Sequence, residues 1–285
     1  MPMMLEGRVA VVAGGAGSIG GEICRLYATH GAKVLVADRG PDRVDATVAA
    51  ITAQGGTATG FIADLTAASA MDELAEQADL FGPADILVNC LGHYLKIEPF
   101  ERNTEQTWQE LYEINLLPVF RSCTRFVPGM RERQFGRIIN FSSVEGIRAS
   151  PDMAVYGAFK GAVDAFTRSL AVEVAADNVL VNSIAVDKTR SYQTNFFQFA
   201  EDYKDLIPSW LPIGRLGEPA DVAKIALFLA SDLASWMVGS TLTADGGTMA
   251  AGGWYRTPQR WTTMPLLHQY FEPPEVNLAR PRSMQ

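Results

Sequence analysis

The sequence predicts an α/β protein in which a parallel sheet of seven strands is doubly wound, with helices on both of its faces. Two observations lead to this fold class. Short apolar runs alternate with stretches whose apolar residues recur at helical spacing along most of the 285 residues. The first apolar run leads into a glycine-rich turn and then a helical pattern, the order that begins a nucleotide-binding unit.

The strands are assigned to apolar runs that are typical of buried strands, and each is followed by turn residues or a helical pattern. They are expected at Arg8–Ala13, Lys33–Asp38, Thr57–Ile62, Asp85–Asn89, Ile138–Ser143, Val179–Ile184 and near Thr241.

A long helix is expected between the fourth and fifth strands, where apolar residues recur from Trp108 to Met130. Asn115 and Pro118 lie inside this pattern. Pro118 has no N–H to donate to the carbonyl of Ile114, so the helix is expected to bend beside Asn115.

Composition limits the classes of partner. A hydrophobic content of 48% in 285 residues supports one large domain, while a net charge of −8 and a pI near 5.0 disfavour nucleic acid and acidic lipid. No apolar run reaches the roughly 18 residues of a membrane span, and Met1 to Arg8 lacks a signal-peptide core. We therefore expect a cytoplasmic protein with a small-molecule partner. Three scattered cysteines favour core packing in a reducing compartment and no metal role.

The glycine-rich turn from Gly14 to Gly20 follows the first strand and opens a helix. Glycines allow close approach of a ligand, and free N–H groups at a helix start suit a pyrophosphate, so Gly14, Ser18, Ile19 and Gly20 are candidate cofactor contacts. Asp38 ends the second strand at the spacing expected of a ribose ligand. Its carboxylate would repel a 2′-phosphate and so favours NAD over NADP, although the adjacent Arg39 would partly offset that repulsion.

Tyr156 and Lys160 stand four positions apart on a predicted helix, which places both polar tips on one face. A neighbouring ammonium favours the phenolate, so we expect Lys160 to lower the pKa of Tyr156 and make it a general base. Ser143 precedes Tyr156 by thirteen positions at the end of a predicted strand. An ordinary exposed helix pair is the alternative for Tyr156 and Lys160 alone.

This constellation resembles the short-chain dehydrogenase/reductase superfamily, and the resemblance covers roughly residues 5 to 247. It implies a Rossmann fold, catalysis by Ser143, Tyr156 and Lys160, and assembly as a homotetramer or homodimer. It further implies that Asn115 in Ile-Asn-Leu is a fourth catalytic residue, placed to hold a water that connects the lysine to solvent. The cofactor positions that it implies are Asp64, Leu65, Asn89, Tyr156, Lys160 and Thr189, with Ser191 as an alternative to Thr189.

The chain departs from the family's pattern at four places. Ala13 and Ser18 replace a threonine and a glycine of the glycine turn, Cys90 and Leu91 replace Asn-Ala after the fourth strand, and Val186 with Asp187 replaces Pro-Gly after the sixth. The last departure lies where the family's chain passes the nicotinamide.

The resemblance implies an NAD-dependent oxidoreductase that interconverts a secondary alcohol and a ketone. Aromatic residues in a predicted lid, about residues 188 to 215, favour a bulky aromatic or alicyclic substrate, while Arg148 and Arg190 leave room for an anionic group. Two alternatives remain open: an NADPH-type ketoacyl reductase, and a catalytically silent cofactor-sensing protein.

Residues 248–285 form a C-terminal extension to the domain of residues 1–247. Several prolines preclude a long helix there, yet the aromatic content is higher than in disordered segments. We expect a docked arm that crosses to a neighbouring subunit and brings Arg256 and His268 towards the substrate.

Overall fold

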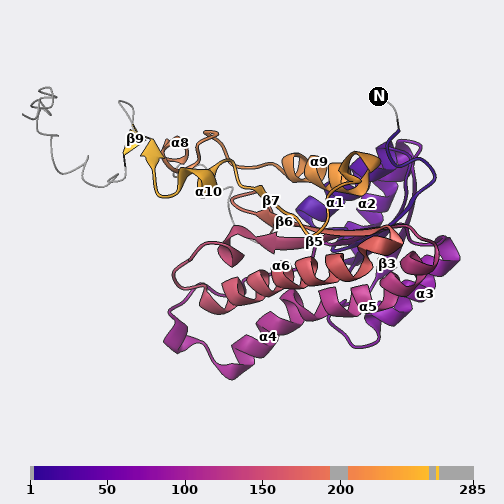
Figure 1. The fold of residues 1–285 in the computed structure, drawn as a ribbon, viewed down its shortest axis with the longest axis horizontal. Coiled ribbons are helices and arrows are strands. Elements are labelled where there is room, and N and C mark those ends of the chain that lie inside the picture. Colours follow the sequence, from indigo (N-terminus) through magenta and orange to yellow (C-terminus); the bar gives the residue numbers. More distant parts are fainter. Residues whose placement is uncertain (1–2, 193–204, 257–260, 263–285) are drawn as a thin grey trace, which may run out of the picture.

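The computed structural model describes residues 3–192, 205–256 and 261–262, and its centre is a seven-stranded parallel sheet (Figure 1). The strand order is β3-β2-β1-β4-β5-β6-β7, so the chain adds strands outwards on one side from β1 to β3 and then on the other side from β4 to β7, with the switch point between β1 and β4. This arrangement confirms the doubly wound fold. The strands are β1 (Val9–Ala13), β2 (Lys33–Asp38), β3 (Thr57–Ile62), β4 (Ile86–Asn89), β5 (Gly136–Ser143), β6 (Val179–Val186) and β7 (Thr241–Ala244).

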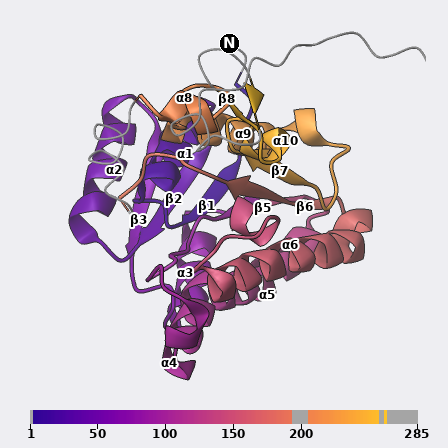
Figure 2. The same ribbon diagram turned by 90° about the vertical axis from the view of Figure 1, so that its left-hand side faces the viewer.

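Helices cover both faces of the sheet, as Figures 1 and 2 show. One layer contains α1 (Ser18–Thr29), α2 (Pro41–Ala53) and α9 (Pro219–Ala230). The opposite layer contains α3 (Ala70–Phe81), α4 (Glu105–Asn115), α5 (Leu117–Glu132) and α6 (Ala154–Val174). Short 3-10 turns complete these connections: η1 (Phe100–Arg102), η2 (Val144–Gly146), η3 (Ala175–Asp177) and η4 (Asp232–Ala234).

The strands are apolar on both faces because a helix layer covers each face. In β1, Val12 packs into the core beneath α1 and α9, whereas its neighbour Val11 packs into the core beneath α3 and α5. Successive strand residues point to opposite faces, so one continuous apolar run supplies both cores. This packing fixes the sheet and leaves its carboxyl edge for function.

The long helix expected from Trp108 to Met130 is wrong, because the structure divides it into α4 and α5 with a break at Leu116. Pro118 stands in the first turn of α5, where a missing N–H costs no helical hydrogen bond. The proline therefore starts a second helix instead of bending a single one. Asn115 becomes the last residue of α4 and lies 1% exposed.

Beyond β6 the described chain includes α8 (Ile207–Trp210), and beyond β7 it includes α10 (Thr248–Ala251), β8 (Tyr255–Arg256) and β9 (Trp261–Thr262). Strands β8 and β9 pair antiparallel, and β8 contacts α8 of the same chain (Figure 1). The start of the extension thus folds against its own lid segment. His268 and several aromatic residues of the predicted lid and arm lie outside the described residues, the aromatics being Phe196, Phe197, Phe199, Tyr203, Tyr270 and Phe271.

Within the described ranges, no helix combines the length and apolar character needed to cross a bilayer.

Candidate active site

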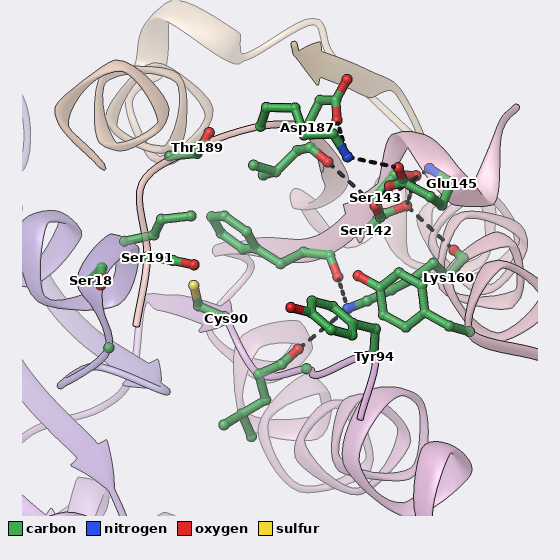
Figure 3. Close-up of a pocket in the computed structure, with 18 of the residues that line it drawn as sticks. Ser18, Cys90, Tyr94, Ser142, Ser143, Glu145, Lys160, Asp187, Thr189 and Ser191 are labelled. Atoms are coloured by element: carbon green, nitrogen blue, oxygen red, sulfur yellow. Dashed lines mark hydrogen bonds and ion pairs between the residues drawn. The ribbon is translucent and has the colours of Figure 1, made fainter. Parts of the chain in front are cut away.

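A cavity of about 440 Å³ lies at the carboxyl edge of the sheet, beside β1, β5 and β6. Figure 3 shows Ser18 and Ser191 towards one end of it and Ser143, Glu145 and Asp187 towards the other. The edge is where ligands bind in doubly wound sheets, since loops from both helix layers converge there. Ser143, Tyr156 and Lys160 all line this cavity, so the structure brings together the three residues singled out for catalysis.

Lys160 is held by main-chain carbonyls and not by a carboxylate. Its Nζ donates to the oxygen of Phe141 at 3.0 Å and to that of Leu91 at 3.4 Å (Figure 3). The residue is 3% exposed. Burial lowers the pKa of Lys160 to about 8. The first turns of α6 therefore present an amine that can change charge near neutral pH.

The expected lowering of the Tyr156 pKa is wrong for the protein alone. Burial raises the pKa of Tyr156 to about 12, and a hydrogen bond with Ser143 opposes this shift only in part. The Lys160 ammonium lies 5.9 Å from the centre of the Tyr156 ring, too far to outweigh the loss of solvent. Without a ligand, both groups are therefore shifted towards their neutral forms.

Ser143 ends β5 and caps the 3-10 turn η2, where its Oγ accepts from the N–H of Glu145 at 3.4 Å. Its hydroxyl also donates a short hydrogen bond to the carboxylate of Glu145 and contacts the carbonyl of Val186 at 3.3 Å. The serine predicted to hold a substrate oxygen is thus bonded to an acidic neighbour.

Glycines let η2 rest directly on the backbone of α6. A Cβ on Gly146 would meet the nitrogen of Gly161 at 2.7 Å, and a Cβ on Gly157 would meet the oxygen of Glu145 at 2.8 Å. Main-chain contact, with no side chain between, therefore sets the distance between the strand that carries Ser143 and the helix that carries Tyr156.

Asn115 supports the wall of the site through its amide. Its Nδ2 donates to the carbonyl oxygens of His93 and Leu111, both at 2.9 Å, and its Oδ1 accepts from the N–H of His93 at 3.0 Å. The residue therefore fixes the loop after β4 against the end of α4. Gly92 in that loop lies between Asn115 and Lys160, since a Cβ there would meet both side chains.

Asn89 does not line the cavity with the other predicted cofactor residues. Its amide accepts from Ser122 at 2.8 Å and donates to Asn140 at 2.9 Å, and Asn140 in turn donates to Thr167 at 2.9 Å. All four side chains are buried. The structure places Asn89 in a polar chain that ties β4 and β5 to α5 and α6.

The glycine turn takes the shape that close approach of a ligand requires. Gly14 has a φ of 81°, and a Cβ on Gly20 would meet the oxygen of Gly14 at 2.0 Å, so neither position accepts a side chain. Helix α1 starts directly afterwards with no side-chain cap at Gly17, which leaves its first N–H groups to a ligand. Ser18 accepts from the N–H of Tyr192 at 3.1 Å and thereby joins this turn to the start of the lid.

An adjoining cavity of about 300 Å³ is lined by Asp38, Asp64 and Leu65 and shares Gly14 with the main one. Asp38 accepts from the N–H of Gly40 at 3.2 Å and pairs with Arg43 at 3.3 Å. Asp64 accepts from the N–H and hydroxyl of Thr66 at 3.0 and 2.8 Å, which lowers the pKa of its carboxyl.

Thr189 and Ser191 both line the main cavity on the segment after β6, and Thr189 pairs with Gly217 in a parallel bridge. The set of groups therefore fits a dinucleotide: a side-chain-free turn for the pyrophosphate, a carboxylate at the end of β2 for a ribose, and hydroxyls beside the inner end.

Sequence reasoning missed several residues of the site. Tyr94 lies edge-on to Tyr156 with 6.3 Å between ring centres, and Glu145 and Lys188 also line the cavity. Trp210 of α8, an aromatic residue of the predicted lid, lines it too. Glu145 stands two positions after Ser143, so its place in the stretch up to Tyr156 was a signal that could have found it. Tyr94 and Lys188 lie in loops whose paths the sequence pattern does not define.

Four charged residues meet at the inner end of the cavity: Glu145, Arg148, Asp187 and Lys188, called the charged quartet below. Arg148 bonds Asp187 at 2.9 Å and lies 3.7 Å from Glu145, while Lys188 lies 3.4 Å from Asp187 and 3.6 Å from Glu145. Thr248 of α10 donates to Asp187 at 2.7 Å. Arg148 and Arg190 were the residues that the sequence offered as binders of an anionic substrate group. Both pair with carboxylates of the protein, Arg148 with Asp187 at 2.9 Å and Arg190 with Glu218 at 2.8 Å.

A family model described as enoyl-(acyl carrier protein) reductase matches residues 14–249. This match covers the glycine turn, the three catalytic candidates and the final strand. The chain belongs to the short-chain dehydrogenase/reductase superfamily. It is therefore an oxidoreductase of the type that uses a nicotinamide cofactor, as the resemblance in its motifs implied.

Similar proteins act on different substrates. A galactitol 2-dehydrogenase of Cereibacter sphaeroides is 36% identical over 248 residues, which is 85% of this chain and 95% of the relative. A 3-oxoacyl-(acyl-carrier-protein) reductase of Agrobacterium tumefaciens with NADP bound has a TM-score of 0.81 and 30% identity, covering 86% of this chain and 95% of that one. A 7α-hydroxysteroid dehydrogenase complexed with NADH has a TM-score of 0.80 and 31% identity, covering 86% and 95%.

Proposed function

We propose that the protein interconverts a secondary alcohol and a ketone, with NAD as the preferred cofactor. The observation that supports this best is the common wall formed by Ser143, Tyr156 and Lys160 in a cavity continuous with a dinucleotide-shaped site. Apolar and aromatic side chains line much of the remaining wall, among them Tyr94, Ile97, Met153 and Trp210. Such a lining favours a substrate with a sizeable apolar or ring surface.

In the proposed oxidation, Tyr156 removes the alcohol proton as general base while Ser143 holds the substrate oxygen. Because burial raises the pKa of Tyr156 to about 12 in the protein alone, its phenolate would form only with the positive charge of the oxidised nicotinamide beside it. Lys160, four positions along α6, holds the nicotinamide ribose together with Tyr156. Bound nicotinamide supplies the hydride acceptor. Lys160 moves its own proton towards the loop that Asn115 fixes, and the reverse reduction uses the same groups.

The preference for NAD rests on Asp38. Its carboxylate is 8% exposed at the end of β2, where it can accept bonds from ribose hydroxyls and repel a 2′-phosphate. Arg43 already pairs with this carboxylate, and Arg39 lines the same cavity, so repulsion is reduced but remains. A similar protein was solved with NADP bound, so the preference of this protein has to be measured as the ratio of kcat/KM with NAD to kcat/KM with NADP.

The test is a panel of cyclic and aromatic secondary alcohols offered with NAD and with NADP, followed by absorbance of the reduced cofactor. Turnover of at least one alcohol, faster with NAD, supports the proposal. Tight NADH binding with no turnover across the panel would instead support the catalytically silent alternative.

A ketoacyl reductase is a second candidate because of the similarity to the Agrobacterium enzyme. Acetoacetyl-CoA with NADPH separates the two proposals. A higher kcat/KM for that pair than for any ketone in the panel with NADH would favour the second one. An enoyl reductase is not proposed, since related enoyl reductases separate tyrosine and lysine by six residues and not three.

We also propose a homodimer or homotetramer formed through α5 and α6. Phe120, Val127, Phe166 and Leu170 line an apolar depression between these helices, a surface suited to a two-fold contact. Light scattering that shows a monomer at micromolar concentration would contradict this. The arm of residues 248–285 and its place over a neighbouring subunit remain a proposal on the same footing.

A further inference from the structure

We propose that Glu145 makes the site selective for a neutral vicinal diol, in which the carbon next to the reacting carbinol also bears a hydroxyl. This inference rests on the proposed oxidation of a secondary alcohol and names its substrate class. Its starting point is the hydrogen bond between the hydroxyl of Ser143 and the carboxylate of Glu145 (Figure 3).

Ser143 has a single hydroxyl hydrogen, and in the structure its shorter donor contact is with Glu145, while the carbonyl of Val186 is a second acceptor at 3.3 Å. To hold the oxygen of a substrate as a donor, Ser143 must give up this bond. Oε2 of the Glu145 carboxylate would then lose its donor while the side chain is only 7% exposed, and the ion pairs of Oε1 with Arg148 and Lys188, at 3.7 and 3.6 Å, are too long to replace that hydrogen bond. Leaving a buried acceptor without a partner costs about 1–3 kcal/mol, and more for a charged group.

A second substrate hydroxyl removes this conflict. The oxygens of a vicinal diol lie roughly one hydrogen-bond length apart, as do Ser143 Oγ and the Glu145 carboxylate. The reacting oxygen can therefore take the hydrogen of Ser143 while the neighbouring hydroxyl donates to Glu145 in its place. Glu145 then keeps a donor, and Ser143 is free to act on the reacting oxygen.

The rest of the charged quartet favours a neutral ligand. The two carboxylates are almost fully buried, with side chains 7% and 1% exposed, and the two cations that face them are about one-third exposed. Two negative and two positive charges balance, so an anionic substrate group would compete with Glu145 and Asp187 for Arg148 and Lys188. A hydroxyl brings no charge and can use both kinds of partner.

Space for such a contact remains at Glu145 and Asp187. The ion pairs of Glu145 Oε1, at 3.7 Å to Arg148 and 3.6 Å to Lys188, are longer than hydrogen bonds. Asp187 Oδ1 is buried, lies 3.4 Å from Lys188 Nζ and makes no hydrogen bond to any part of the chain that the structure describes. Both residues line the cavity, so polar capacity at its inner end points to a hydroxylated ligand.

The experiment compares four compounds that share a cyclohexanol ring and differ in the substituent beside the carbinol, with the full-length protein and NAD: cis-1,2-cyclohexanediol, cis-2-methylcyclohexanol of matched size, unsubstituted cyclohexanol, and cis-2-hydroxycyclohexanecarboxylate. We expect kcat/KM for the diol to exceed that for the methyl analogue by at least about tenfold, with most of the difference in kcat because Ser143 is released. In Glu145→Gln this ratio should fall to near unity. Glu173→Gln, the same change at an exposed position on α6, should leave it unchanged.

Equal use of the diol and the methyl analogue by the wild type, or an unchanged ratio in Glu145→Gln, would overturn the inference. A preference for the carboxylate analogue would also overturn it, in favour of anion binding by Lys188. If Glu145→Gln does not fold, Glu145→Asp, which withdraws the carboxylate by one methylene, is expected to lower the same ratio.

Absence of turnover with all four compounds would count against the proposed function. Selectivity for the diol would then be tested by measuring binding. Calorimetry of the diol and the methyl analogue with the enzyme–NADH complex then decides. Tighter binding of the diol supports the inference, and equal or undetectable binding of both overturns it.

Discussion

The nucleotide end and the substrate end of the cavity are built in different ways. At the nucleotide end, Asp38 and Asp64 bond to groups two to five positions along the chain, and the glycine turn offers mainly backbone, with Ser18 as its one long-range side-chain contact among the described residues, to Tyr192. At the substrate end, Asp187 bonds to Arg148 and Thr248, which are 39 and 61 positions away. The first end can keep its shape through local structure, whereas the second depends on three distant segments meeting. A change at one end should therefore leave the other nearly intact.

The sharpest division between the ends should come from Tyr156→Phe, which removes only the ionisable hydroxyl. We expect kcat to fall by roughly 10²–10⁴-fold, because proton transfer is lost while the ring still packs. NADH affinity, measured by fluorescence titration, should stay nearly unchanged. The control is Tyr112→Phe on α4, which removes a phenol hydroxyl from a ring that packs against Phe159 of α6, the helix that carries Tyr156. This variant should retain activity. Activity of Tyr156→Phe within about tenfold of wild type would break the proposed mechanism.

Lys160→Met tests whether the buried charge of Lys160, which the proposed function needs, lowers the stability of the folded protein. The lowered pKa of Lys160, to about 8 from 10.5, corresponds to roughly 3 kcal/mol against folding with this group charged. The variant should therefore lose activity, bind NADH less tightly and yet unfold at a higher urea concentration.

The pH dependence of that stability difference has a definite sign. Between about pH 8 and 10.5 the unfolded wild type binds more protons than the folded one, so its stability rises with pH. The advantage of Lys160→Met should be greatest below pH 8 and should shrink as pH approaches 10.5. Lys224→Met, at an exposed position on α9, should show no such trend, and a gap that widens with pH would refute the account.

Asp38→Ala should affect the nucleotide end alone. Removing the carboxylate leaves Arg39 and Arg43 beside the ribose, so kcat/KM with NADP relative to NAD should rise by roughly ten- to a hundredfold, about 1.4–2.7 kcal/mol. The ratio of diol to methyl-analogue turnover should not move. Asp42→Ala, an exposed neighbour, is the matched control. Wild-type enzyme that already uses both cofactors equally would show that the arginines prevail.

The smallest effect is expected at the substrate end from Thr248→Val, which keeps the shape but removes the donor to Asp187. Stability should fall by about 1 kcal/mol and the KM for substrate should rise, with NAD affinity unchanged. Thr248→Ser should preserve both properties. A variant that loses NAD affinity but keeps its substrate KM would reverse the division between the two ends.

The same contrast explains how far the sequence could predict the molecule. The predicted ends of six strands lie within two residues of the observed ends, because a buried strand appears in the sequence as a continuous apolar run. The seventh strand lies at Thr241, where it was expected. Ser143, Tyr156 and Lys160 were brought together as expected from their spacing. Pro118 was misread because a proline inside an apolar pattern fits both a bent helix and the first turn of a new one.

The shift of the Tyr156 pKa was misjudged for a different reason. Sequence spacing shows that an ammonium is near, but it does not show how much water both groups lose. The charged quartet was equally hidden, since Asp187 entered only as a departure from Pro-Gly. Its partners come from separate parts of the chain, and no local pattern links them.

The glycine contact between η2 and α6 has a consequence for how this enzyme can change over evolution. Because Gly146 and Gly157 join the two elements through main chain, the spacing of the reacting groups does not depend on which side chain stands between them at position 145. Lineages of this protein could exchange that side chain and acquire a new substrate without rebuilding the catalytic frame. An alanine at either glycine would instead separate the frame itself, so these two positions should tolerate far less variation than the acidic residue beside them.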